Sequence, residues 1–166
     1  ASVFGVNLPD GIQVIKWNPG AATFTQPDTI IGGTWYDVDF NPSATTISPG
    51  EGIFVLNNTG VNTNVTFTGE VVQGSKTINI NPGYGFYSSI PPVSQDLTTN
   101  GLPTVNGLQY MTFTSGSYSQ PITYIDGYGW SDTSFNLVPV APAVGQGFVL
   151  LNPGSSTNWT RGFTVQ

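Results

Sequence analysis

Short apolar runs separated by turn-forming residues dominate the chain. The runs are rich in β-branched and aromatic side chains and are bounded by Gly, Pro or Asn, which is typical of strands; they cover residues 13–17, 52–56, 65–67, 76–80, 84–90 and 147–151. No stretch offers roughly 11 residues of helical periodicity between breakers, so we expect no long helix. Turn signals recur every ~8–12 residues, as in antiparallel sandwiches and barrels. We therefore predict an all-β fold of two tandem β-sandwich/barrel-like repeats of antiparallel strands.

The second half of the chain repeats the first. The segment 32–57 aligns without gaps with 127–152, an offset of 95 residues that places Trp35 on Trp130 and Asn57 on Asn152. Paired glycines at 50/52 and 145/147 also coincide, and we expect them to form the turn into a buried strand. We assign residues 1–73 to a first repeat and residues 74–166 to a second.

The first repeat is the shorter one. In the second copy, roughly twenty residues, enough for two strands, precede Gly107 without a counterpart before Gly11. Three explanations remain open. The strands were never needed, upstream sequence was trimmed, or a neighbouring molecule supplies the missing strand, as in donor-strand complementation.

Charge is scarce and negative. Three Lys or Arg residues face nine carboxylates, and the formal net charge is −6 at pH 7. Nucleic acids and anionic membrane surfaces are bound mainly through Lys and Arg, so neither is an expected partner. No apolar run approaches the ~20 residues of a membrane-spanning helix, so membrane insertion is not expected either. Solubility must come from Asn, Thr, Ser and Gly.

The chain contains no Cys and no His. Disulfides, thiolate ligands and thiol nucleophiles are therefore excluded together. With few charges and many Thr and Asn residues, this composition favours an extracellular or cell-surface location. Ala1 is compatible with the residue left after removal of a signal peptide.

Two segments carry a resemblance to a known group of proteins. They are Ile47–Asn58, with its Pro-Gly-Glu-Gly turn, and Val65–Gly74, with its Gly-Glu-Val strand. The chain resembles secreted bacterial tandem β-repeat proteins of uncharacterised function. It lacks the apolar segment that opens the first copy in such proteins and keeps only the second-copy version near Gly83–Pro91. The resemblance implies export and a β fold, and it brings no catalytic residues.

We find no catalytic residue and expect no enzyme. Glu51 and Glu70 could form a glycosidase carboxylate pair, but Gln146 replaces Glu51 in the second copy and no acid replaces Glu70. Without His or Cys, the Ser and Thr hydroxyls lack their usual activating base. Hydrogen bonds that fix a turn are the better interpretation of both glutamates.

Calcium is the one cofactor considered. Asp37, Asp39 and Asn41 place oxygen atoms at alternating positions, as a calcium loop does. Pro42 and Ser48 stand where that loop needs Gly and Glu, and the second copy has Ser134 in place of Asp39. An Asx-type turn is the alternative.

Two functional hypotheses follow. The first is a non-enzymatic structural subunit of an extracellular filament, sheath or surface layer, a homo-oligomer or polymer joined by β-strand addition. The residues expected to form its assembly strands are Ala1, Ser2, Val3, Phe4, Gly5 and Val6 at one end, and Phe163, Thr164, Val165 and Gln166 at the other.

The alternative is a glycan-binding module with two pseudo-equivalent aromatic sites. Trp35, Trp130 and Trp159 are its candidate contacts, because aromatic faces with Asn, Asp and Thr nearby suit sugar rings. Core packing is the other interpretation of Trp35 and Trp130, because large aromatic side chains dominate core packing. Burial of these two side chains would remove the main support for glycan binding.

Overall fold

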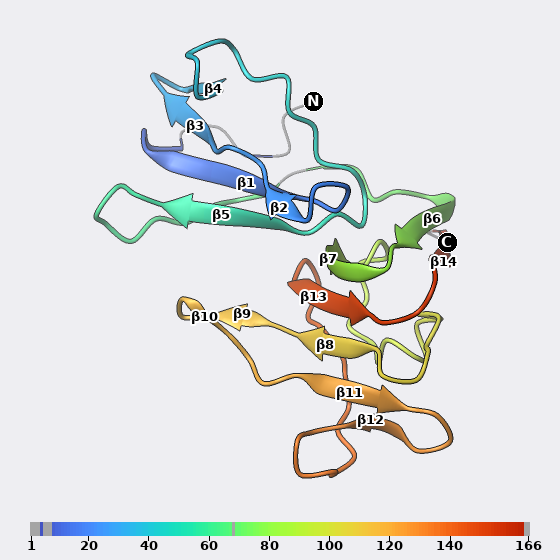
Figure 1. Ribbon diagram of the computed structural model, residues 1–166. Helices are drawn as coiled ribbons and strands as arrows, with labels where there is room; N and C mark the ends of the chain where they lie inside the picture. Colours follow the sequence, from blue (N-terminus) through green and yellow to red (C-terminus); the bar gives the residue numbers. More distant parts are fainter. Residues whose placement is uncertain (1–3, 5–7, 68, 165–166) are drawn as a thin grey trace. The chain divides into compact units, whose positions relative to one another are not determined.

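The computed structural model describes Phe4 and residues 8–67 and 69–164 (Figure 1). In this part of the chain there are strands and turns but no helix, and every strand pairing is antiparallel. The prediction of an all-β fold without a long helix is confirmed.

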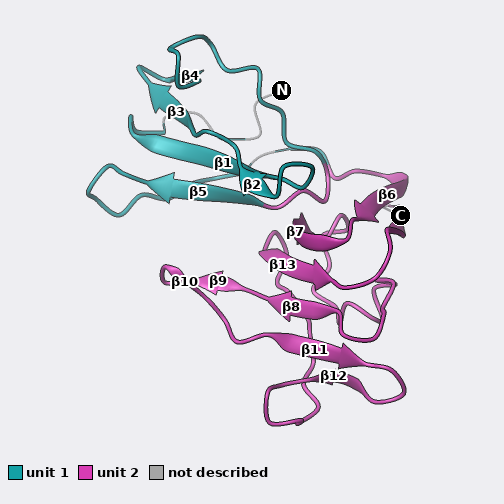
Figure 2. Ribbon diagram, viewed as in Figure 1, with its two compact units in different colours: residues 1–48, 53–70 teal, residues 49–52, 71–166 magenta. Residues whose placement is uncertain are grey.

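The chain divides into two compact units (Figure 2). Unit 1 comprises Ala1–Ser48 and Ile53–Glu70, and unit 2 comprises Pro49–Gly52 and Val71–Gln166. The chain thus leaves unit 1 for four residues and then returns to it. The repeat boundary assigned from the sequence lies at 73/74, and the boundary between the units lies at 70/71.

Unit 1 is built around one long central strand. Its strands are β1 (Ile12–Asn18), β2 (Thr23–Phe24), β3 (Asp28–Ile31), β4 (Thr34–Tyr36) and β5 (Ile53–Asn57). β1 pairs with β2 and β3 along one edge and with β5 along the other, and β3 pairs with β4. The turn between β3 and β4 uses two glycines at positive φ, Gly32 (58°) and Gly33 (77°), a conformation that glycine adopts without steric cost.

Unit 2 contains the other nine strands of the described chain. They are β6 (Gly74–Ile80), β7 (Gly83–Ser88), β8 (Gln109–Met111), β9 (Phe113–Thr114), β10 (Ser117–Tyr118), β11 (Ile122–Ile125), β12 (Gly129–Ser131), β13 (Gly147–Asn152) and β14 (Thr157–Phe163). The main sheet has the order β12-β11-β8-β13-β7, while β9 with β10 and β6 with β14 form two-stranded ribbons.

The two strand networks share order and register. In unit 1 Gln13 of β1 lies opposite Thr29 and Leu56, and in unit 2 Gln109 of β8 lies opposite Thr123 and Leu151. The sheet of unit 2 has one further strand, β7, which pairs with β13 over six residues. The strand that corresponds to β13 in unit 1 is β5.

Each unit has its own apolar core. The core of unit 1 consists of Phe4, Leu8, Ile12, Val14 and Ile30, with Trp35, Ile47, Ile53, Val55 and Val65 packed partly buried against it. The core of unit 2 is larger and includes eleven buried side chains, Trp159 and Leu150 among them. Among the described residues, unit 1 therefore has fewer buried apolar side chains and fewer strands than unit 2.

One predicted strand is wrong. Residues 65–67 do not form a strand; only Phe67 makes an isolated antiparallel bridge, to Phe4. Val65 still packs against the core of unit 1, which explains the apolar pattern. Phe67 itself is exposed, and no neighbouring strand continues the pairing beyond it among the described residues.

Candidate functional site

The clearest difference between the two units is the pairing of β5 in unit 1 and of its counterpart β13 in unit 2. β5 pairs with β1 on one side, and no strand of the described chain pairs with its other side. β13, in the same position of unit 2, pairs with β8 on one side and with β7 on the other. The central residues Phe148, Val149 and Leu150 of β13 are buried, whereas Ile53–Leu56 of β5 are only half-buried.

Hydrogen bonds around β1 show which backbone groups of β5 point outward. The Lys16 N–H donates to Thr25 Oγ1 (3.0 Å) and the Lys16 carbonyl accepts from Thr25 N–H (2.8 Å), on the side of β1 away from β5. Backbone groups alternate between the two sides of a strand, so Phe54 and Leu56 bond to β1. The N–H and C=O groups of Ile53, Val55 and Asn57 therefore face the outer edge.

The same alternation explains how β7 covers β13. The Gly52 N–H donates to the Phe86 carbonyl (3.0 Å), and the Ser88 N–H donates to the Gly50 carbonyl (2.9 Å). The backbone groups of Gly83, Gly85 and Tyr87 consequently face β13, opposite Asn152, Leu150 and Phe148. These three residues of β13 correspond to Asn57, Val55 and Ile53 of β5.

β5 also differs from the strands β6 and β14 in its charge. Natural proteins often protect an edge strand with a lysine or another charged side chain. The two strands of the β6–β14 ribbon carry Lys76 and Arg161, which lie directly opposite each other. β5 has the sequence IFVLN and carries no charge.

Gly50 and Gly52 are each restricted by a neighbouring strand, Gly50 by β6 and Gly52 by β7. A Cβ atom on Gly52 would lie 2.8 Å from the Tyr87 backbone nitrogen, and one on Gly50 would overlap the side chain of Ile78. Gly50 also has a φ of +85°. The Pro-Gly-Glu-Gly segment therefore lies against β7 in unit 2, and Glu51 forms an isolated bridge to Tyr87 there.

The predicted assembly strands are only partly described. Ala1, Ser2, Val3, Gly5, Val6, Val165 and Gln166 lie outside the described residues. Phe4 is buried in unit 1, where its ring centroid lies 5.0 Å from that of Trp35 and 5.2 Å from that of Phe67. Phe163 ends β14 opposite Gly74 of β6, and Thr164 follows it as an exposed residue.

Two of the three predicted glycan contacts require correction. Trp159 is 0% exposed and donates its indole N–H to the Asn100 carbonyl (2.9 Å). Trp130 is 4% exposed and donates to Thr98 Oγ1 (2.9 Å). Neither ring offers a face to a ligand, because both are core side chains of unit 2. Trp35 is half-buried and packs against Phe4 and the core of unit 1.

The candidate calcium residues form an Asx turn. Asp37 Oδ1 accepts the backbone N–H groups of Asp39 (3.0 Å) and Asn41 (2.8 Å). Asp132 does the same with Ser134 (2.8 Å) and Asn136 (2.9 Å). In the described chain no three His, Cys, Asp or Glu side chains cluster as metal ligands would. The hydrogen bonds match the alternative drawn from the sequence.

The side-chain amide of Asn136 makes the largest contribution to a lowered pKa at Asp132, and the backbone N–H groups of Asn136 and Ser134 add to it. This carboxylate thus stays ionised while it organises the turn.

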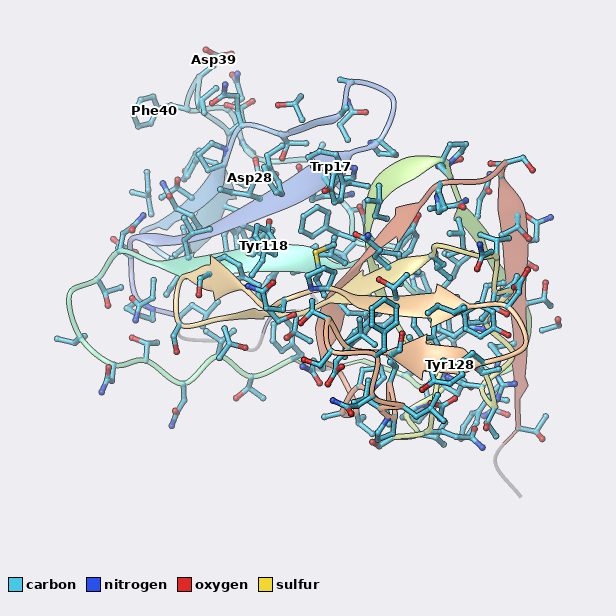
Figure 3. All side chains as sticks on the ribbon, turned by 60° about the horizontal axis from the view of Figure 1, so that its bottom comes forward. Trp17, Asp28, Asp39, Phe40, Tyr118 and Tyr128 are labelled. Carbon is cyan, nitrogen blue, oxygen red and sulfur yellow. The ribbon has the colours of Figure 1, made fainter. Side chains whose placement is uncertain are left out.

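A pair of exposed aromatic side chains was missed by the sequence reasoning. Phe40 is 74% exposed and Phe135 is 71% exposed, and both have a φ of +62°. Each N–H donates to the carbonyl of the turn aspartate, Asp37 (3.1 Å) or Asp132 (3.0 Å). The gapless alignment pairs the two phenylalanines, but only the structure reveals the left-handed conformation. Figure 3 shows the ring of Phe40 directed away from the ribbon.

The two glutamates considered for catalysis belong to different units of the chain. Glu51 is half-buried beside β7 in unit 2, and Glu70 is exposed at the end of unit 1. The most perturbed titratable groups are tyrosines: burial raises the pKa of Tyr110 to about 12 and also raises that of Tyr87. These phenols belong to the core of unit 2.

No family model, curated protein or solved structure matches the chain. The resemblance to secreted tandem β-repeat proteins therefore stays a prediction. In the described part of the chain, no helix is long and apolar enough to cross a membrane.

Proposed function

We propose that the protein is a non-enzymatic structural subunit of an extracellular assembly, and that a strand of a second copy adds to the outer edge of β5. The observation that carries the proposal is the contrast between β5 and β13. In unit 2, β7 pairs with the outer edge of β13. In unit 1, no strand of the described chain pairs with the outer edge of β5. An edge strand of this kind presents a row of N–H and C=O groups that pair with another chain.

The composition of the strand supports a protein strand as the occupant. β5 is uncharged, and Ile53 and Val55 pack against the core of unit 1 while staying half-buried. A strand added to this edge would cover them further, as β7 covers Phe148 and Leu150. The gain would come from backbone hydrogen bonds and from apolar area removed from water.

A second copy is the partner that the chain's own structure favours. β7 demonstrates that this sequence contains strands whose small and aromatic residues fit against β13, the counterpart of β5. β5 carries no charged residue, so the pairing edge itself adds no like-charge repulsion between copies. An extracellular location fits the low content of charged residues and the many Asn and Thr residues of the chain.

The edge is tested by Val55→Pro, with Val55→Ala as its control. Proline removes the outward N–H at the centre of the β5 edge, while alanine removes the same side-chain contacts and keeps the N–H. We expect polymers or oligomers for the unmodified chain and for Val55→Ala in light scattering and electron microscopy. Val55→Pro should be a monomer with an unchanged far-ultraviolet circular dichroism spectrum. A monomeric unmodified chain at every accessible concentration contradicts the proposal.

The donor is tested separately. Deletion of residues 1–6 removes the segment predicted from the sequence to add to a neighbour, and Phe4→Ala removes only the buried ring of that segment. Loss of assembly in the deletion but not in Phe4→Ala identifies this segment as the donor. Assembly that persists in both variants assigns the donor to another strand of the second copy.

A further inference from the structure

The two exposed phenylalanines are held in a conformation that their residue type disfavours. Residues with a Cβ rarely adopt φ > 0, and glycine or asparagine is the usual choice at such a turn position. Phe40 and Phe135 both have a φ of +62° at the tip of equivalent turns. Neither ring is stabilised by burial, since each is more than 70% exposed. Strained backbone in exposed, repeated positions points to a function outside the fold itself.

Each phenylalanine belongs to a turn that is rich in hydrogen-bond acceptors. Asp37 and Asn41 form the first turn with Phe40, and Asp132 and Asn136 form the second with Phe135. Each carboxylate is fixed by backbone N–H groups on Oδ1, while Oδ2 receives only the side-chain amide of the asparagine, at 3.4 Å in the first turn and 3.1 Å in the second. A carboxylate oxygen has two lone pairs, so acceptor capacity is left on Oδ2.

The second turn has an additional exposed aromatic ring. Tyr128 is 49% exposed and donates its hydroxyl to the Phe135 carbonyl (2.8 Å), which ties the β11–β12 turn to the tip. Figure 3 shows Tyr128 on that turn. Val38 in the first loop and Leu137 in the second are exposed aliphatic neighbours. Each tip therefore combines an apolar contact surface with fixed hydrogen-bond acceptors.

We propose that the two tips, residues 37–41 and 132–136, are equivalent binding sites for an uncharged polysaccharide. The C–H face of a sugar ring packs on an aromatic face, and its hydroxyls donate to oriented carboxylates and amides. Neither tip contains a Lys or Arg, and the chain carries a net charge of −6, so anionic glycans are disfavoured. A lipid surface is the weaker fit, since insertion of either ring would draw an ionised carboxylate towards hydrocarbon.

The experiment replaces both phenylalanines in two ways. Phe40→Asn with Phe135→Asn removes both rings, and asparagine tolerates φ > 0. Phe40→Tyr with Phe135→Tyr keeps both aromatic rings and the same disfavoured positive φ. Sedimentation with microcrystalline cellulose and with chitin measures binding, and phosphatidylcholine vesicles are the comparison surface. All chains carry Val55→Pro, so that the outcome does not depend on assembly through β5.

We expect the parent and the tyrosine variant to sediment with at least one polysaccharide. The asparagine variant should bind it at least about tenfold more weakly, at an equal or higher melting temperature. Equal binding of the asparagine and tyrosine variants overturns the proposal. So does sedimentation of the parent with vesicles alone, or with none of the three surfaces.

Discussion

At the scale of single residues, equivalent glycines of the two repeats have different reasons to be glycine. Gly50 and Gly145 both have positive φ, at 85° and 75°. Only Gly50 is also restricted by a neighbour, because a Cβ there would overlap Ile78. Gly52 and Gly147 differ in the same way: Gly52 lies against the backbone of β7, and a Cβ on Gly147 would meet only the Tyr87 carbonyl oxygen at 3.8 Å.

This difference gives a matched pair of substitutions. Gly52→Ala should lower the free energy of unfolding by about 1–3 kcal/mol, because the new methyl group displaces the backbone of β7. Gly147→Ala should change it by less than about 1 kcal/mol, since its Cβ makes an ordinary contact and fits an extended strand. Urea denaturation of the two variants measures both values. Equal destabilisation would show that close approach to β7 is not what requires Gly52.

A buried phenol predicts how stability depends on alkaline pH. An unfolded tyrosine ionises near pH 10, and burial raises the pKa of folded Tyr110 to about 12. Unfolding therefore releases a proton between these values. The stability that Tyr110 contributes is fully present below pH ~10 and is lost as the pH rises towards 12.

Tyr110→Phe removes this titration. The melting temperature of the variant should fall less than that of the unmodified chain between pH 9 and pH ~11.5. At pH 7 the two should melt within a few degrees of each other, because the ring and its packing are kept. Parallel pH profiles would contradict the assignment of alkaline sensitivity to Tyr110.

At the scale of elements, apolar periodicity identified strands but not their partners. The runs at 13–17 and 147–151 fall within β1 and β13, because a largely buried strand appears in the sequence as a short apolar run. The run at 65–67 has the same pattern and makes a single bridge. Whether a strand has a pairing partner depends on residues far away in the sequence, so a local apolar pattern does not predict it.

The candidate sites were harder to predict than the strands. Trp130 and Trp159 are possible glycan contacts from the sequence, but their indole N–H groups donate to acceptors inside unit 2. A large aromatic with one polar atom suits either environment, so its residue type does not decide burial. Phe40 and Phe135 were overlooked for the opposite reason, since phenylalanine in a sequence usually indicates core. The shorter first repeat did predict a missing strand, and in the described part of the chain the outer edge of β5 has no partner strand.

The β6–β14 ribbon offers a test of cross-strand charge. Lys76 and Arg161 lie directly opposite each other and are two of the three Lys or Arg residues in the chain. Like charges in this position destabilise a strand pair. Lys76→Glu should therefore raise the free energy of unfolding by about 0.2–1 kcal/mol at low salt, with a smaller gain at 1 M NaCl.

Lys76→Gln is the control for that substitution, since it removes the repulsion without adding attraction. Its effect should lie between those of Lys and Glu at low salt, and thermal denaturation at the two ionic strengths measures all three chains. A destabilised Lys76→Glu variant would show that Lys76 is held by a carboxylate rather than opposed by Arg161.

At the scale of the whole molecule, the net negative charge acts against association of copies, while the uncharged edge of β5 favours it. The net charge is −6 at pH 7, and the sequence pI is about 4.1. Repulsion between copies acts over the Debye length, about 30 Å at 0.01 M salt and about 8 Å at 0.15 M. Backbone pairing at β5 is insensitive to salt by comparison. The proposed assembly therefore depends on how strongly salt and pH weaken the repulsion between copies relative to the backbone pairing at β5.

Assembly should therefore increase with salt at pH 7 and increase again as the pH approaches 4. Light scattering at 0.01 and 0.5 M NaCl should give a higher mass at the higher salt, because repulsion is screened while the hydrogen bonds at Ile53, Val55 and Asn57 persist. Val55→Pro should stay monomeric under both conditions. A mass that falls with salt would mean that opposite charges join the copies, and assembly of Val55→Pro at high salt would place the contact away from β5.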